Sequence, residues 1–315
     1  MTVNNWPSSV AVVGAAGVIG SGVVERIATG GLAETVYAVD IRDNVVRAHL
    51  IDIGESQIVA GRTETTLVPG EPPSSEHVDI VFVAASAPED PDGDRRGFLR
   101  ANLELLQKLV PSIERLAGSE GIVILLSNPV DILAECLVEL STIKRERILG
   151  YSLNDSIRLR AALGRELDVD AGRIDGWVVG EHGAGQVPLM SRLTLDGAPL
   201  ELTGDERERV VSDIAAWFSR WSELKPGRSS GWTTPRGVAK TIELMRDGIL
   251  HPAVVSTDVF LGTPSFVGLP IRRVAGEFVV ELGAVSDEEM AGLRRAAASV
   301  KNAAAEAIDA LSEGR

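Results

Sequence analysis

The chain reads Val-Ala-Val-Val-Gly-Ala-Ala-Gly-Val-Ile-Gly from Val10 to Gly20, and this stretch decides the fold. Its first four residues form a short apolar run, which is typical of a buried parallel strand. The glycines that follow let the backbone turn tightly and approach a pyrophosphate, whose charge suits the N-terminus of a helix expected over residues 21–29. A glycine pattern alone indicates little, but its strand–turn–helix setting favours a dinucleotide-binding loop.

A second apolar strand, residues 35–39, ends at Asp40, twenty positions after Gly20. A carboxylate there can accept hydrogen bonds from both adenosine ribose hydroxyls, and it repels a 2′-phosphate. The sequence therefore predicts NAD as the cofactor. NADP stays open as an alternative because Arg42 lies two residues further on.

From residue 1 to residue 150, apolar runs alternate with amphipathic stretches, which predicts an α/β fold: an N-terminal Rossmann domain with a doubly wound parallel sheet. The expected strands are 10–13, 35–39, 79–84 and 122–126, and residues 97–116 are expected to be helical. Ligands of such sheets bind beyond the carboxyl ends of the strands. The residues expected at those ends are Gly14, Asp40, Ala85 and Asn128.

Residues 151–315 show a different, mixed pattern, which predicts a C-terminal α+β substrate domain. Asp196-Gly197 marks a hairpin, and Ser286 is a plausible N-cap. The expected helices are 157–167, 205–224, 238–247 and 287–311, and the expected strands are 177–179 and several short ones within 254–280. No flexible linker is evident, so the two domains are expected to be tightly joined.

The run Gly180-Glu181-His182-Gly183 and the pair Asp155 and Arg158 supply groups for chemistry. A carboxylate beside an imidazole stabilises its protonated form and fixes its tautomer. An arginine can hold a substrate carboxylate with two parallel hydrogen bonds, and residues three apart share a helix face. Taken alone, such a histidine is more often structural, and such a pair is more often a solvated salt bridge. Beside a dinucleotide site, they indicate proton and hydride exchange with a 2-keto acid.

With both ends in view, the chain resembles the malate/lactate dehydrogenase family almost end to end. The stretches that carry the resemblance are Val12–Gly20, Ser127–Leu133 (Ser-Asn-Pro-Val-Asp-Ile-Leu), Asn154–Arg160, Gly180–Gly183 with Gln186-Val187-Pro188, and Pro252–Pro264. The resemblance implies the family's two-domain fold, an NAD-dependent 2-hydroxy acid dehydrogenase, and a homodimer or homotetramer.

The resemblance also implies a role for each matching residue. His182 would donate and accept the proton. Asp155 would orient the imidazole of His182 and stabilise its protonated form, and Arg158 would bind the substrate carboxylate. Arg95, found seven residues before Asn102, would polarise the carbonyl as a loop closes, with the adjacent Arg96 as the alternative. Asn128 would bond near the carbonyl and the nicotinamide ribose, and Thr234 is a softer match to a substrate-contacting threonine. The residues expected to bind the cofactor are Gly14, Ala16, Gly17, Val18, Ile19, Gly20, Asp40, Ala85, Asn102 and Asn128.

Glu89 is the main departure from the family, since it stands six residues before Arg95, where malate enzymes have arginine and lactate enzymes usually glutamine. Two like charges about 4 Å apart repel by about 4 kcal/mol at an effective dielectric of about 20, roughly a thousandfold against oxaloacetate. We therefore expect a substrate that is not a dicarboxylate and has a cationic or hydrogen-bond-donating tail. In the alternative, Glu89 points away, Arg96 or Arg236 binds the tail, and the enzyme is a malate dehydrogenase.

Two smaller departures from the family follow Glu89, and the first of them changes the expected pocket wall. Ala184 replaces the acid that the family often has after His-Gly, and Asn154 replaces the usual leucine before the aspartate. These changes leave the chemistry intact and put the substrate in question.

The composition narrows the function further. The chain has 315 residues and a formal net charge of −14, which argues against a nucleic-acid partner. No apolar run has membrane-spanning length, no signal peptide is evident, and the single cysteine, Cys136, is expected to be a buried hydrophobe. These features predict a cytoplasmic protein with a small-molecule substrate.

No metal is expected, because no two histidines have ligand spacing. The NAD-dependent glycoside hydrolases need a metal-binding set of cysteine and histidine. They are disfavoured because the only cysteine, Cys136, is expected on an apolar helix far from His182 in sequence. A non-catalytic NAD-binding protein is the alternative from another class. Trp217 and Trp221, four residues apart on one helix face, are expected in the core or at a subunit contact.

Overall fold

The computed structural model describes residues 6–88, 95–225, 231–257, 261 and 264–313, with Arg95 described by its backbone alone. In the first half, the strands are β1 (Ser9–Val13), β2 (Thr35–Val39), β3 (Thr66–Pro69), β4 (Ile80–Val83), β5 (Ile122–Leu125) and β6 (Ile148–Tyr151). They pair in the order β3-β2-β1-β4-β5-β6, and every pair is parallel. The predicted doubly wound sheet is confirmed.

The helices of the first half connect these strands. They are α1 (Val18–Gly30), α2 (Asp43–Ala60), α3 (Arg95–Ala117) and α4 (Val130–Leu140). All residues of β4 and β5 are buried, as expected of apolar strands that are covered on both faces. The order of the sheet reverses between β1 and β4, so the glycine-rich stretch after β1 lies at the topological switch point, where ligands of such sheets bind.

The second half contributes further strands to the same sheet. Its elements are α5 (Leu153–Leu167), β7 (Ile174–Asp175), β8 (Val178–Gly180), β9 (Gln186–Pro188), β10 (Thr194–Leu195), β11 (Ala198–Pro199), α6 (Gly204–Ala215), α7 (Trp217–Glu223), α8 (Thr233–Arg246), β12 (His251–Ser256), β13 (Phe266–Val274), β14 (Glu277–Val280) and α9 (Asp287–Glu313), with short 3₁₀ turns at Arg145–Arg147, Ala171–Arg173 and Met190–Arg192. Strand β12 pairs antiparallel with β6, and the sheet continues through β13, β8 and β9. The two halves are therefore joined by strand pairing as well as by the chain.

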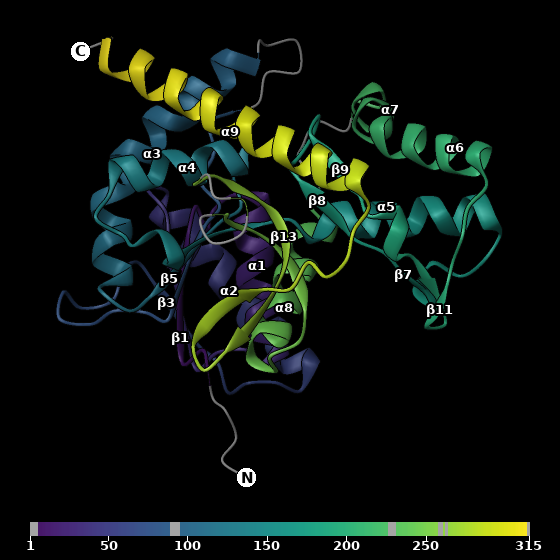
Figure 1. Cartoon of the computed structure of the whole chain (residues 1–315). Coiled ribbons are helices and arrows are strands. Elements are labelled where there is room, and N and C mark those ends of the chain that lie inside the picture. Colours follow the sequence, from purple (N-terminus) through teal and green to yellow (C-terminus); the bar gives the residue numbers. More distant parts are fainter. Residues whose placement is uncertain (1–5, 89–94, 226–230, 258–260, 262–263, 314–315) are drawn as a thin grey trace.

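Long helices cover this sheet and tie its ends together. Figure 1 shows α9 crossing the molecule from α3 and α4 toward β8 and β9, and α9 contacts all four of these elements. Ser286 caps α9 as predicted: its hydroxyl accepts from the Glu289 N–H at 3.2 Å, while the Glu289 carboxylate accepts from the Ser286 N–H at 2.8 Å.

Two local predictions had different outcomes. The hairpin at Asp196-Gly197 is confirmed, since β10 and β11 pair across two residues with positive φ, 52° and 79°. The single helix predicted over 205–224 was wrong. The segment is divided at Ala216 into α6 and α7.

Burial agrees with the predicted role of Cys136. Its thiol is fully buried in α4, and burial raises its pKa to about 12, so it is an inert small hydrophobe. Among the described residues, no helix is long and apolar enough to cross a membrane. Within the same residues, no group of three or more His, Cys, Asp and Glu side chains is placed to hold a metal ion.

Candidate active site

The glycine loop after β1 has the geometry that close approach to a phosphate requires. Gly14 has φ of +92°, and a Cβ there would collide with the backbone of Ala85 at the end of β4. A Cβ at Gly20 would collide with the Gly14 carbonyl, so α1 can begin close to β1 only with glycine there. Gly17 is the N-cap of α1, and the adjacent Val18 is 46% exposed. The first turn of α1 thus begins at the surface beside the glycine loop.

Asp40 lies directly against this loop. Its Oδ2 accepts from the Ala16 N–H at 3.0 Å, and its Oδ1 accepts from the Arg42 N–H at 3.0 Å. The Arg42 Nε is 3.4 Å from the same Oδ1. The carboxylate therefore stands at the carboxyl end of β2, where the adenosine ribose of a dinucleotide meets the fold.

Asn102 acts within the protein in this structure. Its side-chain oxygen accepts from the Ser86 hydroxyl at 3.0 Å and the Ala87 N–H at 2.9 Å, and its amide donates to the Phe98 carbonyl at 3.0 Å. The residue is 2% exposed. Asn102 thus fixes the segment that follows β4. It would influence cofactor binding indirectly, by positioning that segment. Ala85 is half-buried, and Ile19 is half-buried in the first turn of α1.

The proton-transfer group, the acid and the arginine predicted from sequence come together. His182 follows β8, and its Nδ1 is 2.7 Å from the Asp155 Oδ2. The other carboxylate oxygen of Asp155 accepts from the Arg158 Nη1 at 3.2 Å. Asp155 is 3% exposed, and both Asp155 and Arg158 come from the first two turns of α5. One buried carboxylate therefore holds the imidazole and the guanidinium at once.

The charges around His182 favour its protonated form. Burial lowers the pKa of His182, but the attraction and hydrogen bond of Asp155, with a further contribution from Asp131, outweigh it and raise the pKa above its usual value. Burial lowers the pKa of Arg158, and the negative charge of Asp155 beside it opposes that shift. These charges favour an imidazolium at His182 beside the guanidinium of Arg158.

Sequence reasoning missed Asp131. It is the second residue of α4, it is 1% exposed, and its Oδ2 accepts from the His182 main-chain N–H at 2.9 Å. Its Oδ1 is buried and has no hydrogen-bond partner among the described residues. Burial raises the pKa of Asp131 to about 7. The available signal was a carboxylate in the first turn of a largely apolar helix, inside the run that also contains Asn128.

Trp217, which was expected in the core or at a subunit contact, does not lie in the core of the described chain. The residue is half-exposed on α7, and the Arg158 Cζ is 3.7 Å from the centroid of its ring. Trp221 stacks on Trp217 with ring centroids 6.3 Å apart and an angle of 9° between the planes. A cavity of about 130 Å³ borders the contact between Arg158 and Trp217. Its lining residues are Asn154, Ile157, Arg158, Ala161, Arg165, Trp217 and Thr233.

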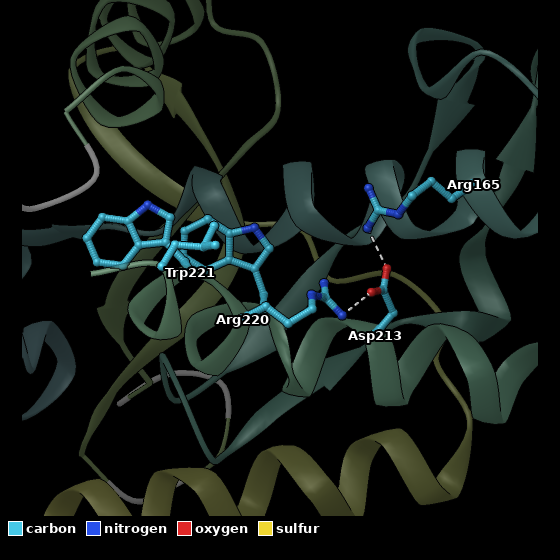
Figure 2. Close-up of a pocket in the computed structure, with 6 residues that line it drawn as sticks. Arg165, Asp213, Arg220 and Trp221 are labelled. Carbon is cyan, nitrogen blue, oxygen red and sulfur yellow. Dashed lines mark hydrogen bonds and ion pairs between the residues drawn. The ribbon is translucent and has the colours of Figure 1, made fainter. Parts of the chain in front are cut away.

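A wider and more open cavity of about 540 Å³ also borders Trp217. Its lining residues are Arg165, Asp213, Trp217, Arg220, Trp221 and Leu224. Figure 2 shows Asp213 between the guanidinium groups of Arg165 and Arg220, with both of which it forms ion pairs. These ion pairs join α5, α6 and α7 and so hold Trp217 over Arg158.

Asn154 and Thr234 form a second polar connection to α5. The Asn154 amide donates to the Thr234 hydroxyl at 2.9 Å, and its oxygen accepts from the Tyr151 hydroxyl at 2.8 Å. The departure at Asn154 thus ties the start of α8 to α5 beside Asp155.

Other predicted residues are placed less closely. Asn128 is exposed at the carboxyl end of β5, just before α4. Arg96 and Arg236 are exposed on α3 and α8. Glu89 and the side chain of Arg95 lie outside the described part of the chain.

A doubly wound sheet with a glycine loop at its switch point and a carboxylate–imidazole pair beyond it defines a nucleotide-dependent dehydrogenase. A family profile described as lactate/malate dehydrogenase, NAD binding domain, matches residues 8–150. The malate dehydrogenase of Haloarcula marismortui is 29% identical over 269 residues, covering 84% of this chain and 88% of that protein. The L-lactate dehydrogenase of Halalkalibacterium halodurans is 25% identical over 296 residues, covering 91% and 93%.

Solved structures agree with these relatives. The structure of malate dehydrogenase from Salinibacter ruber superposes with a TM-score of 0.85 at 25% identity, covering 98% of this chain and 100% of that one. The chain belongs to the lactate/malate dehydrogenase family, and its cofactor is NAD.

Proposed function

We propose that this enzyme interconverts a 2-keto acid and a 2-hydroxy acid, with His182, Asp155 and Arg158 as the groups that handle the substrate. The observation that carries the proposal is the shared carboxylate of Asp155, which bonds His182 at 2.7 Å and Arg158 at 3.2 Å. A carboxylate grip and a proton-transfer group in fixed relation are what an oriented keto acid needs.

Each side chain has one role in the proposed reaction. Arg158 binds the C1 carboxylate of the substrate. Asp155 accepts a hydrogen bond from Nδ1 of His182, so that Nε2 faces the carbonyl oxygen and delivers its proton there in reduction. NADH supplies the hydride that reaches C2. We assign Arg95 to carbonyl polarisation, Asn128 to the neighbourhood of the carbonyl and Thr234 to the substrate pocket, as the family resemblance implies.

The cofactor residues are proposed on the same footing. The loop from Gly14 to Gly20 would hold the pyrophosphate and Asp40 the adenosine ribose. The close backbone packing at Gly14 and the exposed start of α1 support this assignment.

The substrate tail is proposed from the sequence at Glu89. A carboxylate at the selecting position repels a second substrate carboxylate, so we propose a 2-keto acid with a neutral or cationic, hydrogen-bonding tail. Malate is the second candidate, because the relatives at 29% and 28% identity are named malate dehydrogenases. In that case Glu89 points away from the substrate.

One assay separates these candidates. NADH oxidation is measured with a panel of 2-keto acids that have neutral, acidic and cationic tails, on wild type, Glu89→Arg and Glu89→Gln. If wild type does not reduce oxaloacetate and Glu89→Arg does, the result supports Glu89 as the residue that selects the substrate tail. Efficient oxaloacetate reduction by wild type identifies a malate dehydrogenase.

His182→Asn is the control for catalysis itself. We expect turnover to fall by roughly 10²- to 10⁴-fold with NADH binding retained, because general acid–base catalysis contributes about that much. Near-wild-type turnover would remove His182 from the mechanism. Binding of NADH by wild type without turnover of any keto acid would favour the non-catalytic alternative.

A homodimer or homotetramer is proposed as the assembly. Helix α2 exposes Ile51 and Ile58, each at 70%, and Val59 at 90%, and large apolar side chains gathered on one element are typical of a subunit contact. Sedimentation equilibrium tests this, and a monomer at assay concentration contradicts it.

A further inference from the structure

We propose that Asp131 is a second carboxylate partner of His182, a positioning residue that fixes the main chain at the proton-transfer group and increases the proton affinity of the imidazole. This inference rests on the proposed function, in which His182 exchanges the substrate proton. It adds a residue from α4 to a site otherwise built from α5 and the segment after β8.

The hydrogen bonding of Asp131 is the first argument. One carboxylate oxygen accepts from the His182 N–H at 2.9 Å, while the other is buried without a partner among the described residues. Leaving a buried carboxylate oxygen unpaired is costly. A buried acid kept with spare acceptor capacity beside an imidazole therefore points to a role for its charge.

Glu135, one turn along α4, shows what a structural acid in this helix looks like. It is 2% exposed, and both of its oxygens are bonded by cations: Arg145 Nη1 at 3.0 Å and Nη2 at 3.1 Å, and Lys301 Nζ at 2.6 Å. Its charge is neutralised within the scaffold. The positive partner of Asp131 is instead His182, whose charge changes during catalysis.

The surrounding charges set the sign of the effect. Among the described residues, the titratable groups that act on this pair are Asp155 and Arg158 from α5 and Glu181 beside the histidine. An ionised Asp131 favours the imidazolium, and Arg158 opposes it. Burial, with Asp155 and Glu181 as like charges, raises the pKa of Asp131 to about 7, while His182 lowers it. The protonation state of each group therefore influences the pKa of the other.

Removal of the Asp131 charge should lower the proton affinity of His182. Reduction needs the imidazolium, so the loss of activity at alkaline pH should begin at a lower pH in the variant. Oxidation needs the neutral imidazole and should extend to lower pH. A merely structural Asp131 would move neither limb.

The test uses Asp131→Asn, which keeps an oxygen to accept from the His182 N–H. The ratio kcat/KM for NADH-dependent reduction is followed across the neutral pH range with the 2-keto acid that wild type reduces best. We expect the alkaline limb to move by roughly one pH unit toward acid, a tenfold change in proton affinity, with the Kd for NADH unchanged. The matched control Glu135→Gln should lower the thermal midpoint without moving the pH profile.

A direct titration keeps the inference testable if the variant folds poorly. The chain has 4 histidines, so the ring resonance of His182 can be identified by its loss in His182→Asn. In wild type we expect that resonance to show a second titration step, caused by protonation of the Asp131 carboxylate. In Asp131→Asn we expect a single step at lower pH. A single-step wild-type titration, or superimposable pH profiles, would overturn the role of Asp131. Near-wild-type turnover in His182→Asn would instead overturn the proposed function.

Discussion

The guanidinium carbon of Arg158 lies 3.7 Å from the ring centroid of Trp217, so the proposed carboxylate-binding side chain is stacked on an indole. Asp155 bonds the same guanidinium at its edge. A planar cation held at one edge and one face has little freedom left, and it meets an incoming carboxylate with its orientation already set.

Trp217→Ala should therefore weaken substrate binding more than it weakens cofactor binding. Cation–π contacts contribute about 1–2 kcal/mol when partly desolvated, so we expect KM for the keto acid to rise about tenfold while the Kd for NADH stays constant. Trp221→Ala is the control, because Trp221 stacks on Trp217, whereas the ring that lies over Arg158 is that of Trp217. Equal effects of the two substitutions would contradict a specific role for the Arg158 contact.

Much of the fold was predictable, because its signals are local. Each buried strand is a short apolar run, and the predicted strands 35–39 and 122–126 agree with β2 and β5 within one residue. Strands β3 and β6 were not predicted: β3 is a half-exposed edge strand, and β6 contains Gly150. Nor could the antiparallel pairing of β6 with β12 be read from sequence, since no local pattern encodes a partner a hundred residues away.

The site divides in the same way. His182, Asp155 and Arg158 could be predicted from their residue types and spacing. Asp131 and Trp217 could not, because each acts through a contact between distant segments: α4 with the turn after β8, and α7 with α5. The helix break at Ala216 that aims Trp217 at Arg158 also lacks a local signal, since neither glycine nor proline marks it.

Asp155→Asn tests the origin of the raised pKa of His182. Asp155 raises that pKa, so the imidazolium persists to higher pH in wild type than it would with an amide at this position. In the variant, reduction should fail as pH rises through the lowered pKa, and we expect losses of roughly 10²- to 10⁴-fold at neutral pH that shrink toward acid. The measurement is kcat for reduction against pH; a loss that is equal at all pH values would mean that Asp155 only orients the ring.

Gly14→Ala tests the cofactor loop. The φ of +92° and the collision with the Ala85 backbone both oppose a side chain there, so NADH binding, followed by nucleotide fluorescence, should fall by at least tenfold and the thermal midpoint should drop. Gly54→Ala is the matched control, since it lies within α2 with nothing near its Cβ, and it should be neutral or slightly stabilising. Wild-type NADH affinity in Gly14→Ala would place the pyrophosphate elsewhere.

The choice of NAD over NADP should depend on Asp40 and Arg42 together. The Asp40 carboxylate, 8% exposed at its side chain, lies 3.4 Å from the Arg42 Nε, so the arginine is held by the acid that repels a 2′-phosphate. In Asp40→Ser that repulsion disappears, and Arg42 becomes available for a phosphate. We expect the ratio of kcat/KM for NADPH to that for NADH to rise by at least tenfold. NADH use should also decline, because the bond to the Ala16 N–H is weakened. Adding Arg42→Ala to this variant should abolish the gain with NADPH. If the gain persists without Arg42, another cation binds the 2′-phosphate, and the assignment of Asp40 and Arg42 to the adenosine ribose site is wrong.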